Sequence, residues 1–272
     1  MSQRDMTKTI QDLRNISWSE RASSSGTAGT YLKARTGSGA RMVYYKLSRY
    51  NGIVIDGHEC ANEIVASRLM RVLGISHLEY RLIHARVSIN GTEHETWLNT
   101  SRNFRKSGER KLGLGTFWEL YRREDETPYD FCLRHGWQNE IHRTMLVDYL
   151  VANRDRHASN VEVLIARDGS VRLAPIFDTG FSLLAPYAND EERALSFDPL
   201  ADVATTNFIG SRSLEENVLL TTEAELQQRL EESDRGEILR GLSDVLPQTY
   251  LGKIWDIIWR RWQHYETLRA HR

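Results

Sequence analysis

A polar segment lies between a helical pattern and a hairpin pattern, and this order constrains the fold more than any other feature of the chain. The apolar spacing of residues 139–151 predicts a helix, and polar residues continue from its end to Asn160. Two β-rich runs, 161–166 and 171–176, then flank an Arg-Asp-Gly-Ser turn and lead to Asp178. Because a hairpin returns the chain to the edge from which it started, we expect one polar site built from both segments.

Three residues of this arrangement have the order that phosphoryl transfer requires. That reaction needs a carboxylate beside the attacking hydroxyl and two oxygen ligands that hold Mg²⁺ on the phosphates. Asn160 follows Asp155 at the spacing of a kinase catalytic loop, and Asp178 stands where a metal-binding aspartate is expected. The order of the three residues is more informative than any one of them.

Simpler interpretations of these residues also exist. Asp and Asn in a polar loop are usually turn residues. The second carboxylate favours a catalytic role, because a buried strand does not normally end in an aspartate without a partner. Arg154 and Arg156 flank Asp155, and they fit either a contact with a phosphorylated residue or an ordinary ion pair.

A segment of small residues near the N-terminus has the composition of a phosphate-binding loop. Its residues are Ser25, Gly26, Thr27, Ala28, Gly29 and Thr30. Backbone N–H groups in such a loop can approach phosphate oxygens closely. A flexible linker has the same composition, and the chain has no Walker pattern, which disfavours a P-loop NTPase.

Lys46 lies in an apolar strand pattern over residues 42–47, where a charged side chain needs a partner or a function. A kinase requires a lysine that contacts the nucleotide phosphates and a helical glutamate that orients it. The apolar spacing of residues 61–73 predicts a helix, and this helix offers Glu63, or Glu59 one turn earlier, as that glutamate.

The remaining pattern predicts an α+β fold with a β-rich N-lobe and a helical C-lobe. Strands are expected on both sides of the Gly-Ser-Gly turn at 37–39, and an Asn90-Gly91 turn predicts a hairpin over residues 80–98. Everything after Ser213 has a helical pattern. The predicted lobes are residues 1–101 and 102–272.

Composition excludes several classes of protein. The 36 Lys and Arg residues balance 37 Asp and Glu residues, so the chain has no basic footprint and direct binding of nucleic acid is not expected. No apolar run is long enough to span a membrane, and no signal peptide is recognisable. Two cysteines make no disulfide framework, which favours a cytoplasmic protein without a membrane partner.

Three motifs resemble those of the HipA-like family of bacterial serine/threonine kinases. They are Asn-x-Asp-Arg-His-x-x-Asn at 153–160, Leu-Ala-Pro-x-x-Asp at 173–178, and an Asn-Glu helix at 62–63 that leads into Leu-Gly-Ile. The resemblance covers residues 23–210 and implies a two-lobed kinase-like fold. It also implies that Asp155 is the catalytic base, that Asn160 and Asp178 bind Mg²⁺, and that Lys46, with Glu63 as its partner, binds the phosphates of ATP.

The chain resembles the short forms of this family, of the CtkA and HipT type, because no room for the extra N-terminal subdomain is expected before Ser23. The family implies an ATP- and Mg²⁺-dependent kinase that phosphorylates a protein. Its toxin-type members act on a translation component such as an aminoacyl-tRNA synthetase and have an antitoxin partner. The resemblance further implies autophosphorylation on a serine of the phosphate loop, here Ser23, Ser24 or Ser25.

Two other functions stay open at this stage. A kinase of related fold could act on a small molecule or a lipid headgroup, although the chain has no basic amphipathic stretch. A catalytically inactive nucleotide-binding module is the second alternative. The presence of Lys46, Asp155, Asn160 and Asp178 together argues against it.

Overall fold

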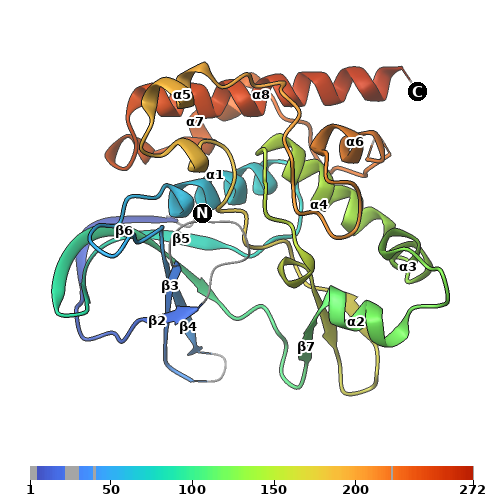
Figure 1. The fold of residues 1–272 in the computed structure, drawn as a ribbon, viewed down its shortest axis with the longest axis horizontal. Coiled ribbons are helices and arrows are strands. Elements are labelled where there is room, and N and C mark those ends of the chain that lie inside the picture. Colours follow the sequence, from blue (N-terminus) through green and yellow to red (C-terminus); the bar gives the residue numbers. More distant parts are fainter. Residues whose placement is uncertain (1–4, 22–30, 39–40, 222, 272) are drawn as a thin grey trace.

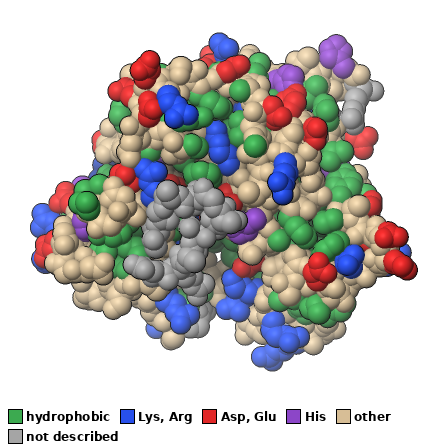
Figure 2. Space-filling view, in the orientation of Figure 1, with side chains coloured by type: hydrophobic (Ala, Val, Ile, Leu, Met, Phe, Trp, Pro, Cys, Tyr) green, Lys and Arg blue, Asp and Glu red, His purple; other side chains and the backbone are tan. Residues whose placement is uncertain are grey.

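The computed structural model describes residues 5–21, 31–38, 41–221 and 223–271. Most helices lie in one layer of the molecule, two β-sheets lie side by side beneath this layer, and one short helix lies beside the smaller sheet (Figure 1). A notch separates the sheets at the edge away from the helices (Figure 2). This is the predicted α+β fold with a β-rich lobe and a helical lobe. In the part of the chain that is described, no helix combines the length and the apolar character needed to cross a membrane.

The larger sheet contains six strands in the order β1-β5-β6-β4-β3-β2. The strands are β1 (Met6–Leu13), β2 (Ser19–Arg21), β3 (Tyr31–Thr36), β4 (Val43–Leu47), β5 (Tyr80–Ile89) and β6 (Thr92–Arg102). The β5–β6 hairpin turns at Asn90 and Gly91, whose positive φ angles of 50° and 83° suit the tight turn that the sequence predicts. Strand β1 pairs in parallel with β5 at the sheet edge.

Helix α1 (Glu59–Val72) is the element that joins the two lobes. Its residues from Glu59 to Met70 are all buried, because the sheet covers one side and the helical lobe covers the other. The buried Arg68 guanidinium donates to the Asp5 carboxylate and to the main-chain oxygens of Ile238 and Arg240. The predicted boundary between residues 101 and 102 coincides with the end of β6, and a division into two domains there stays a prediction.

The helical lobe contains seven α-helices in its described residues. They are α2 (Leu114–Tyr121), α3 (Pro128–Arg134), α4 (Gln138–Leu150), α5 (Glu191–Ser196), α6 (Leu214–Leu219), α7 (Arg235–Ile238) and α8 (Gln248–Ala270). Trp255 and Trp262 of α8 are buried in the core, as their helical spacing indicates. The prediction that everything after Ser213 is helical is wrong, since residues 223–231 between α6 and α7 contain no helix.

The smaller sheet positions the polar loop. Its strands are β7 (Arg110–Gly113), β8 (Glu162–Ile165) and β9 (Val171–Leu173), all antiparallel. The β8–β9 hairpin follows the loop directly, and the chain beyond it returns along the segment before β5, where Leu78 N donates to Ile176 O at 2.8 Å. Asp178 therefore lies at the junction of the two lobes.

Candidate active site

The polar loop after α4 is shaped by a buried aspartate of the helix. Asp148 is fully buried and accepts hydrogen bonds from Asn153 Nδ2 at 2.8 Å and from Arg156 Nε and Nη2 at 2.9 and 2.8 Å. Arg156 also donates to the main-chain oxygens of Asn160 at 2.9 Å and Phe177 at 2.7 Å. Arg156 therefore forms an internal ion pair that joins the loop to the residue before Asp178.

Replacing Arg156 with methionine is expected to lower the free energy of unfolding by about 3–5 kcal/mol, because the buried Asp148 would lose its cationic partner and keep the hydrogen bond from Asn153. Chemical denaturation measures this loss. Arg86→Met is the matched control, because its partner Glu95 lies at the surface, and a change below about 1 kcal/mol is expected there. Equal losses in the two variants would contradict the role given to Arg156.

Lys46 is bound by two carboxylates at the lobe junction. Its Nζ lies 2.5 Å from Glu63 Oε1 and 2.6 Å from Asp178 Oδ1. Glu63 is fully buried and also accepts from Asn99 Nδ2 at 2.6 Å. The structure thus brings three predicted site residues into direct contact, and it places Glu63 rather than Glu59 beside Lys46. Glu59 instead accepts from Tyr31 Oη and from the main-chain nitrogen of Arg49.

The charges of this cluster stabilise one another. Burial works against protonation of Lys46, but the Asp178 and Glu63 carboxylates raise its pKa well above the ordinary value. Burial also works against ionisation of Asp178. The positive charges of Lys46 and Lys33 outweigh this effect and hold the pKa of the Asp178 carboxyl far below its usual range. Asp178 therefore stays anionic and Lys46 stays cationic at neutral pH, which is the charge state that metal and phosphate binding require.

Asp155 lies on the polar loop and contacts two side chains, those of Asn160 and Thr206. Asn160 Nδ2 donates to the main-chain oxygen of Asp155 at 2.7 Å, and Thr206 Oγ1 donates to Asp155 Oδ1 at 3.2 Å. The backbone holds this threonine in place, because Thr206 N donates to Arg154 O at 2.9 Å. A hydroxyl thus sits against the carboxylate that is predicted to act on a substrate hydroxyl.

A cavity of about 420 Å³ opens beside Lys46, Asn160 and Asp178, and Asp155 is not among the residues that line it. Its walls come from β3 and β4, from the end of β6 and residues 103–105 after it, and from Asn160 and Asp178. Phe104 and Phe177 stack in its lining with their ring centroids 5.8 Å apart, which provides an apolar surface next to the charged cluster. Lysine and arginine side chains flank the notch between the sheets on the face shown in Figure 2.

Lys33 also lines this cavity, and it was not predicted from the sequence as a residue of the site. Strands β3 and β4 pair Lys33 with Lys46, and Lys33 Nζ lies 4.0 Å from Asp178 Oδ2. The site therefore has two lysines near one aspartate. Neither Lys33 nor Thr206 could be identified from spacing along the chain. Lys33 reaches the site through the register of β3 and β4, and Thr206 reaches Asp155 from a loop 51 residues away.

The side chains at the cavity fit a partly protein-bound Mg²⁺. Asp178 has an anionic oxygen to offer, and Asn160 uses its amide nitrogen, and not its Oδ1 atom, for the contact with Asp155. The described residues contain no cluster of three His, Cys, Asp or Glu side chains suited to hold a metal alone. One carboxylate and one amide oxygen suit Mg²⁺, which keeps waters and takes phosphate oxygens as further ligands.

The predicted phosphate loop falls outside the described residues. Its residues Ser25, Gly26, Thr27 and Gly29 and the two preceding serines, Ser23 and Ser24, all lie outside that part of the chain. Strand β2 ends at Arg21 and β3 begins at Tyr31, and these two residues are paired across antiparallel strands. The roles given to the loop, including autophosphorylation at residues 23–25, stay predictions.

Comparison with known proteins identifies the fold. No protein-family model matches this sequence, and the search of curated proteins found no match to it either. The structure is similar to the crystal structure of the Helicobacter pylori proinflammatory kinase CtkA, with a TM-score of 0.64 and 14% sequence identity. This similarity covers 96% of the present chain and 97% of CtkA.

Two weaker similarities involve longer chains. They are HipA of Shewanella oneidensis, from a complex with HipB and operator DNA, and a mutant PAN3 pseudokinase of Neurospora crassa. The TM-scores are 0.41 and 0.37, with 13% and 8% identity. The matches cover 91% and 97% of the present chain but only 63% and 66% of the other chains. The similarity to CtkA over nearly all of both chains shows that this protein has a kinase-like fold with a β-sheet lobe and a helical lobe.

Proposed function

We propose that this protein is an ATP- and Mg²⁺-dependent kinase that transfers phosphate to a serine or threonine hydroxyl of a protein. The observation that carries this proposal is the contact of Lys46 with both Glu63 and Asp178 at the wall of the 420 Å³ cavity. These three residues come from β4, α1 and the segment after β9, and a lysine, a helical glutamate and a metal-binding aspartate are the parts that a kinase requires.

Each residue of the site has a distinct role in this proposal. Lys46 positions the nucleotide phosphates, and Glu63 orients Lys46. Asp178 and Asn160 supply protein ligands for Mg²⁺, which when bound would neutralise charge on the phosphates. Asp155 accepts the proton of the attacking hydroxyl or orients that hydroxyl, and the hydrogen bond from Thr206 supports this, because it shows that a hydroxyl fits against Asp155 Oδ1.

Incubation of the protein with γ-labelled ATP, Mg²⁺ and a bacterial lysate tests the proposal, with mass spectrometry of the labelled products. Phosphoserine or phosphothreonine on a protein is the expected result. Label found only in small molecules or lipids would favour the alternative kinases. Nucleotide binding without any transfer would favour an inactive module. An aminoacyl-tRNA synthetase substrate, an antitoxin partner and a cytoplasmic location stay predictions that rest on the family resemblance and composition.

Lys33→Ala is expected to raise the KM for ATP about tenfold, because one charged contact to a phosphate is lost. Affinity for adenosine, which has no phosphate, is expected to stay unchanged. Lys111→Ala is the matched control, since Lys111 lines the same cavity but its Nζ pairs with Glu162 at 2.6 Å. Equal KM values for Lys33→Ala and Lys111→Ala would contradict a phosphate contact by Lys33.

A further inference from the structure

Asp178 has a backbone conformation that residues other than glycine adopt only occasionally. Its φ angle is +56°, in the left-handed region where a Cβ atom crowds the backbone. This conformation directs the carboxylate toward Lys46 and the cavity. Neighbouring contacts must therefore hold the residue in place, as is usual for strained residues in functional sites.

Each of the three consecutive residues 176–178 has its own contact with a neighbouring segment. Ile176 pairs with the segment before β5, and Phe177 O accepts from Arg156 Nη1 at 2.7 Å. The main-chain N–H of Asp178 itself donates to Tyr80 Oη at 3.1 Å. Tyr80 is 6% exposed and is the first residue of β5, so a rigid sheet supplies this acceptor.

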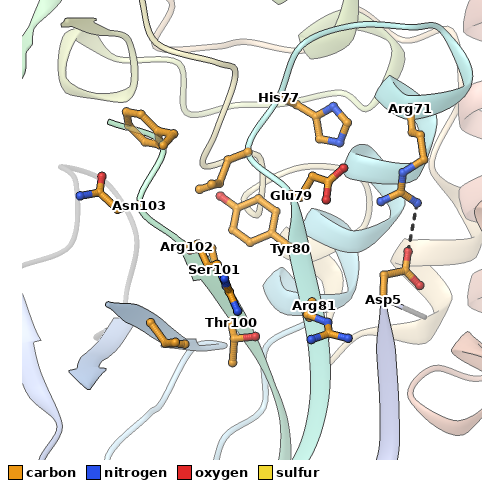
Figure 3. Close-up of a pocket in the computed structure, with 13 residues that line it drawn as sticks. Asp5, Arg71, His77, Glu79, Tyr80, Arg81, Thr100, Ser101, Arg102 and Asn103 are labelled. Carbon is orange, nitrogen blue, oxygen red and sulfur yellow. Dashed lines mark hydrogen bonds and ion pairs between the residues drawn. The ribbon is translucent and has the colours of Figure 1, made fainter. Parts of the chain in front are cut away.

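Tyr80 also lines two neighbouring cavities. They are the 420 Å³ cavity and a second cavity of about 450 Å³, and Ser101 and Phe104 line both as well. Figure 3 shows the Tyr80 ring from β5 beside Ser101 of β6, with which Tyr80 is paired in the sheet. The ring is held by its strand and by these neighbours, so its hydroxyl has a fixed position behind Asp178.

The hydrogen bond from Asp178 to Tyr80 does not depend on the nucleotide. Lys46 holds the Asp178 carboxylate in the present structure, but in the proposed reaction Lys46 turns to the phosphates and Asp178 turns to the metal. The side-chain contact that now fixes Asp178 is then weakened. The backbone contact with Tyr80 can persist, because neither the amide nor the phenol oxygen is needed by nucleotide or metal.

We propose that Tyr80 is a positioning residue, whose hydroxyl keeps Asp178 in the left-handed conformation that presents its carboxylate to Mg²⁺. This proposal rests on the proposed kinase function for its effect on the reaction. The hydrogen bond between the Asp178 amide and the Tyr80 hydroxyl exists without nucleotide or metal. Its effect on the Asp178 backbone can therefore be measured independently of its effect on the reaction.

Tyr80→Phe removes the acceptor oxygen and keeps the ring. Faster amide hydrogen exchange at Asp178 is expected in this variant, with unchanged exchange in the strands β5 and β6. In phosphoryl transfer, kcat is expected to fall about tenfold, and the Mg²⁺ concentration at half-maximal rate is expected to rise several-fold. Affinity for adenosine is expected to stay the same, because the lost contact is to the backbone of Asp178.

Tyr45→Phe is the matched control. Tyr45 lines the same cavity, but its hydroxyl bonds to Thr36 Oγ1 at 3.3 Å, away from Asp178. Thermal unfolding of both variants shows whether either hydroxyl matters for stability alone, since a merely structural loss would not change the Mg²⁺ requirement.

Wild-type hydrogen exchange at Asp178 in Tyr80→Phe would overturn the proposal, whatever the protein's activity. A wild-type Mg²⁺ requirement in an active Tyr80→Phe enzyme would also overturn it and leave the kinase function intact. A wild-type protein that binds nucleotide and Mg²⁺ but transfers no phosphate would contradict the kinase function alone. The Mg²⁺ dependence of binding to a non-hydrolysable ATP analogue would then still test Tyr80.

Discussion

Asp155→Ala is expected to reduce phosphoryl transfer by about 100- to 10,000-fold, the usual contribution of a general acid–base residue. Asp155 lies on the loop that also carries Asn160 and contacts the Thr206 hydroxyl through Oδ1, and in the proposed reaction it acts on the acceptor hydroxyl and not on the nucleotide. Affinity for ATP is therefore expected to stay close to the wild-type value. Single-turnover transfer of labelled phosphate and calorimetric titration with ATP measure the two quantities.

Asp168→Ala is the matched control for this variant. Asp168 lies in the turn between β8 and β9, where its carboxylate bonds only locally, to the backbone and hydroxyl of Ser170. Wild-type transfer rates are expected for Asp168→Ala. If Asp155→Ala also kept the wild-type rate, Asp155 would be a turn residue and not the base. The same outcome would mean that the hydrogen bond from Thr206 to Asp155 does not mark the position of a substrate hydroxyl.

Asp178→Asn is expected to reduce kcat by at least about 100-fold and to raise the Mg²⁺ concentration needed for activity. A neutral amide is a poor substitute for a carboxylate as a ligand of a hard cation. The change also removes one of the two anions beside Lys46, while Glu63 still pairs with that lysine. Folding is therefore expected to persist, and titration of the transfer rate with Mg²⁺ is the decisive measurement. An unchanged Mg²⁺ requirement would contradict the assignment of Asp178.

Lys46→Met gives the contrasting result. It is expected to weaken binding of ATP or its alignment without a specific effect on the Mg²⁺ requirement, because Lys46 contacts phosphate and not the metal in the proposed reaction. It also leaves the buried Glu63 without its cation, which is expected to cost about 3–5 kcal/mol of the free energy of unfolding. Activity must therefore be measured below the unfolding temperature of the variant.

The residues of the site that share a local pattern could be predicted from the sequence. Asp155 and Asn160 lie in one loop, and the hairpin after them has clear strand and turn signals. Lys46 and Glu63 belong to a short strand and a helix with strong periodicity, so their separate elements were recognisable. A contact between Lys46 and a glutamate of this helix was inferred from what a kinase requires, and the family resemblance selected Glu63 over Glu59. The structure places the two charged atoms of Lys46 and Glu63 2.5 Å apart.

Elements at the edges were harder to predict. Strand β1 has exposed residues along most of its length, so it lacks the alternation of a half-buried strand, and its pairing with β5 is a long-range contact. Strand β7 contains Arg110 and Lys111, which in sequence suggest a charged surface segment. It becomes a strand because β8 pairs with it. In both cases the hydrogen-bonding partner is far away in the chain.

The sequence alone determined the central elements around the polar loop, because spacing and periodicity act over a few residues. Together with the family resemblance it also gave the candidate residues for base, metal and phosphate. Only the tertiary structure decided that Lys33 stands opposite Lys46, that Thr206 reaches Asp155 and that Tyr80 holds the amide of Asp178. These contacts join positions up to 98 residues apart. They follow from strand register and from the packing of α1 between the lobes, and no local pattern of residue types encodes them.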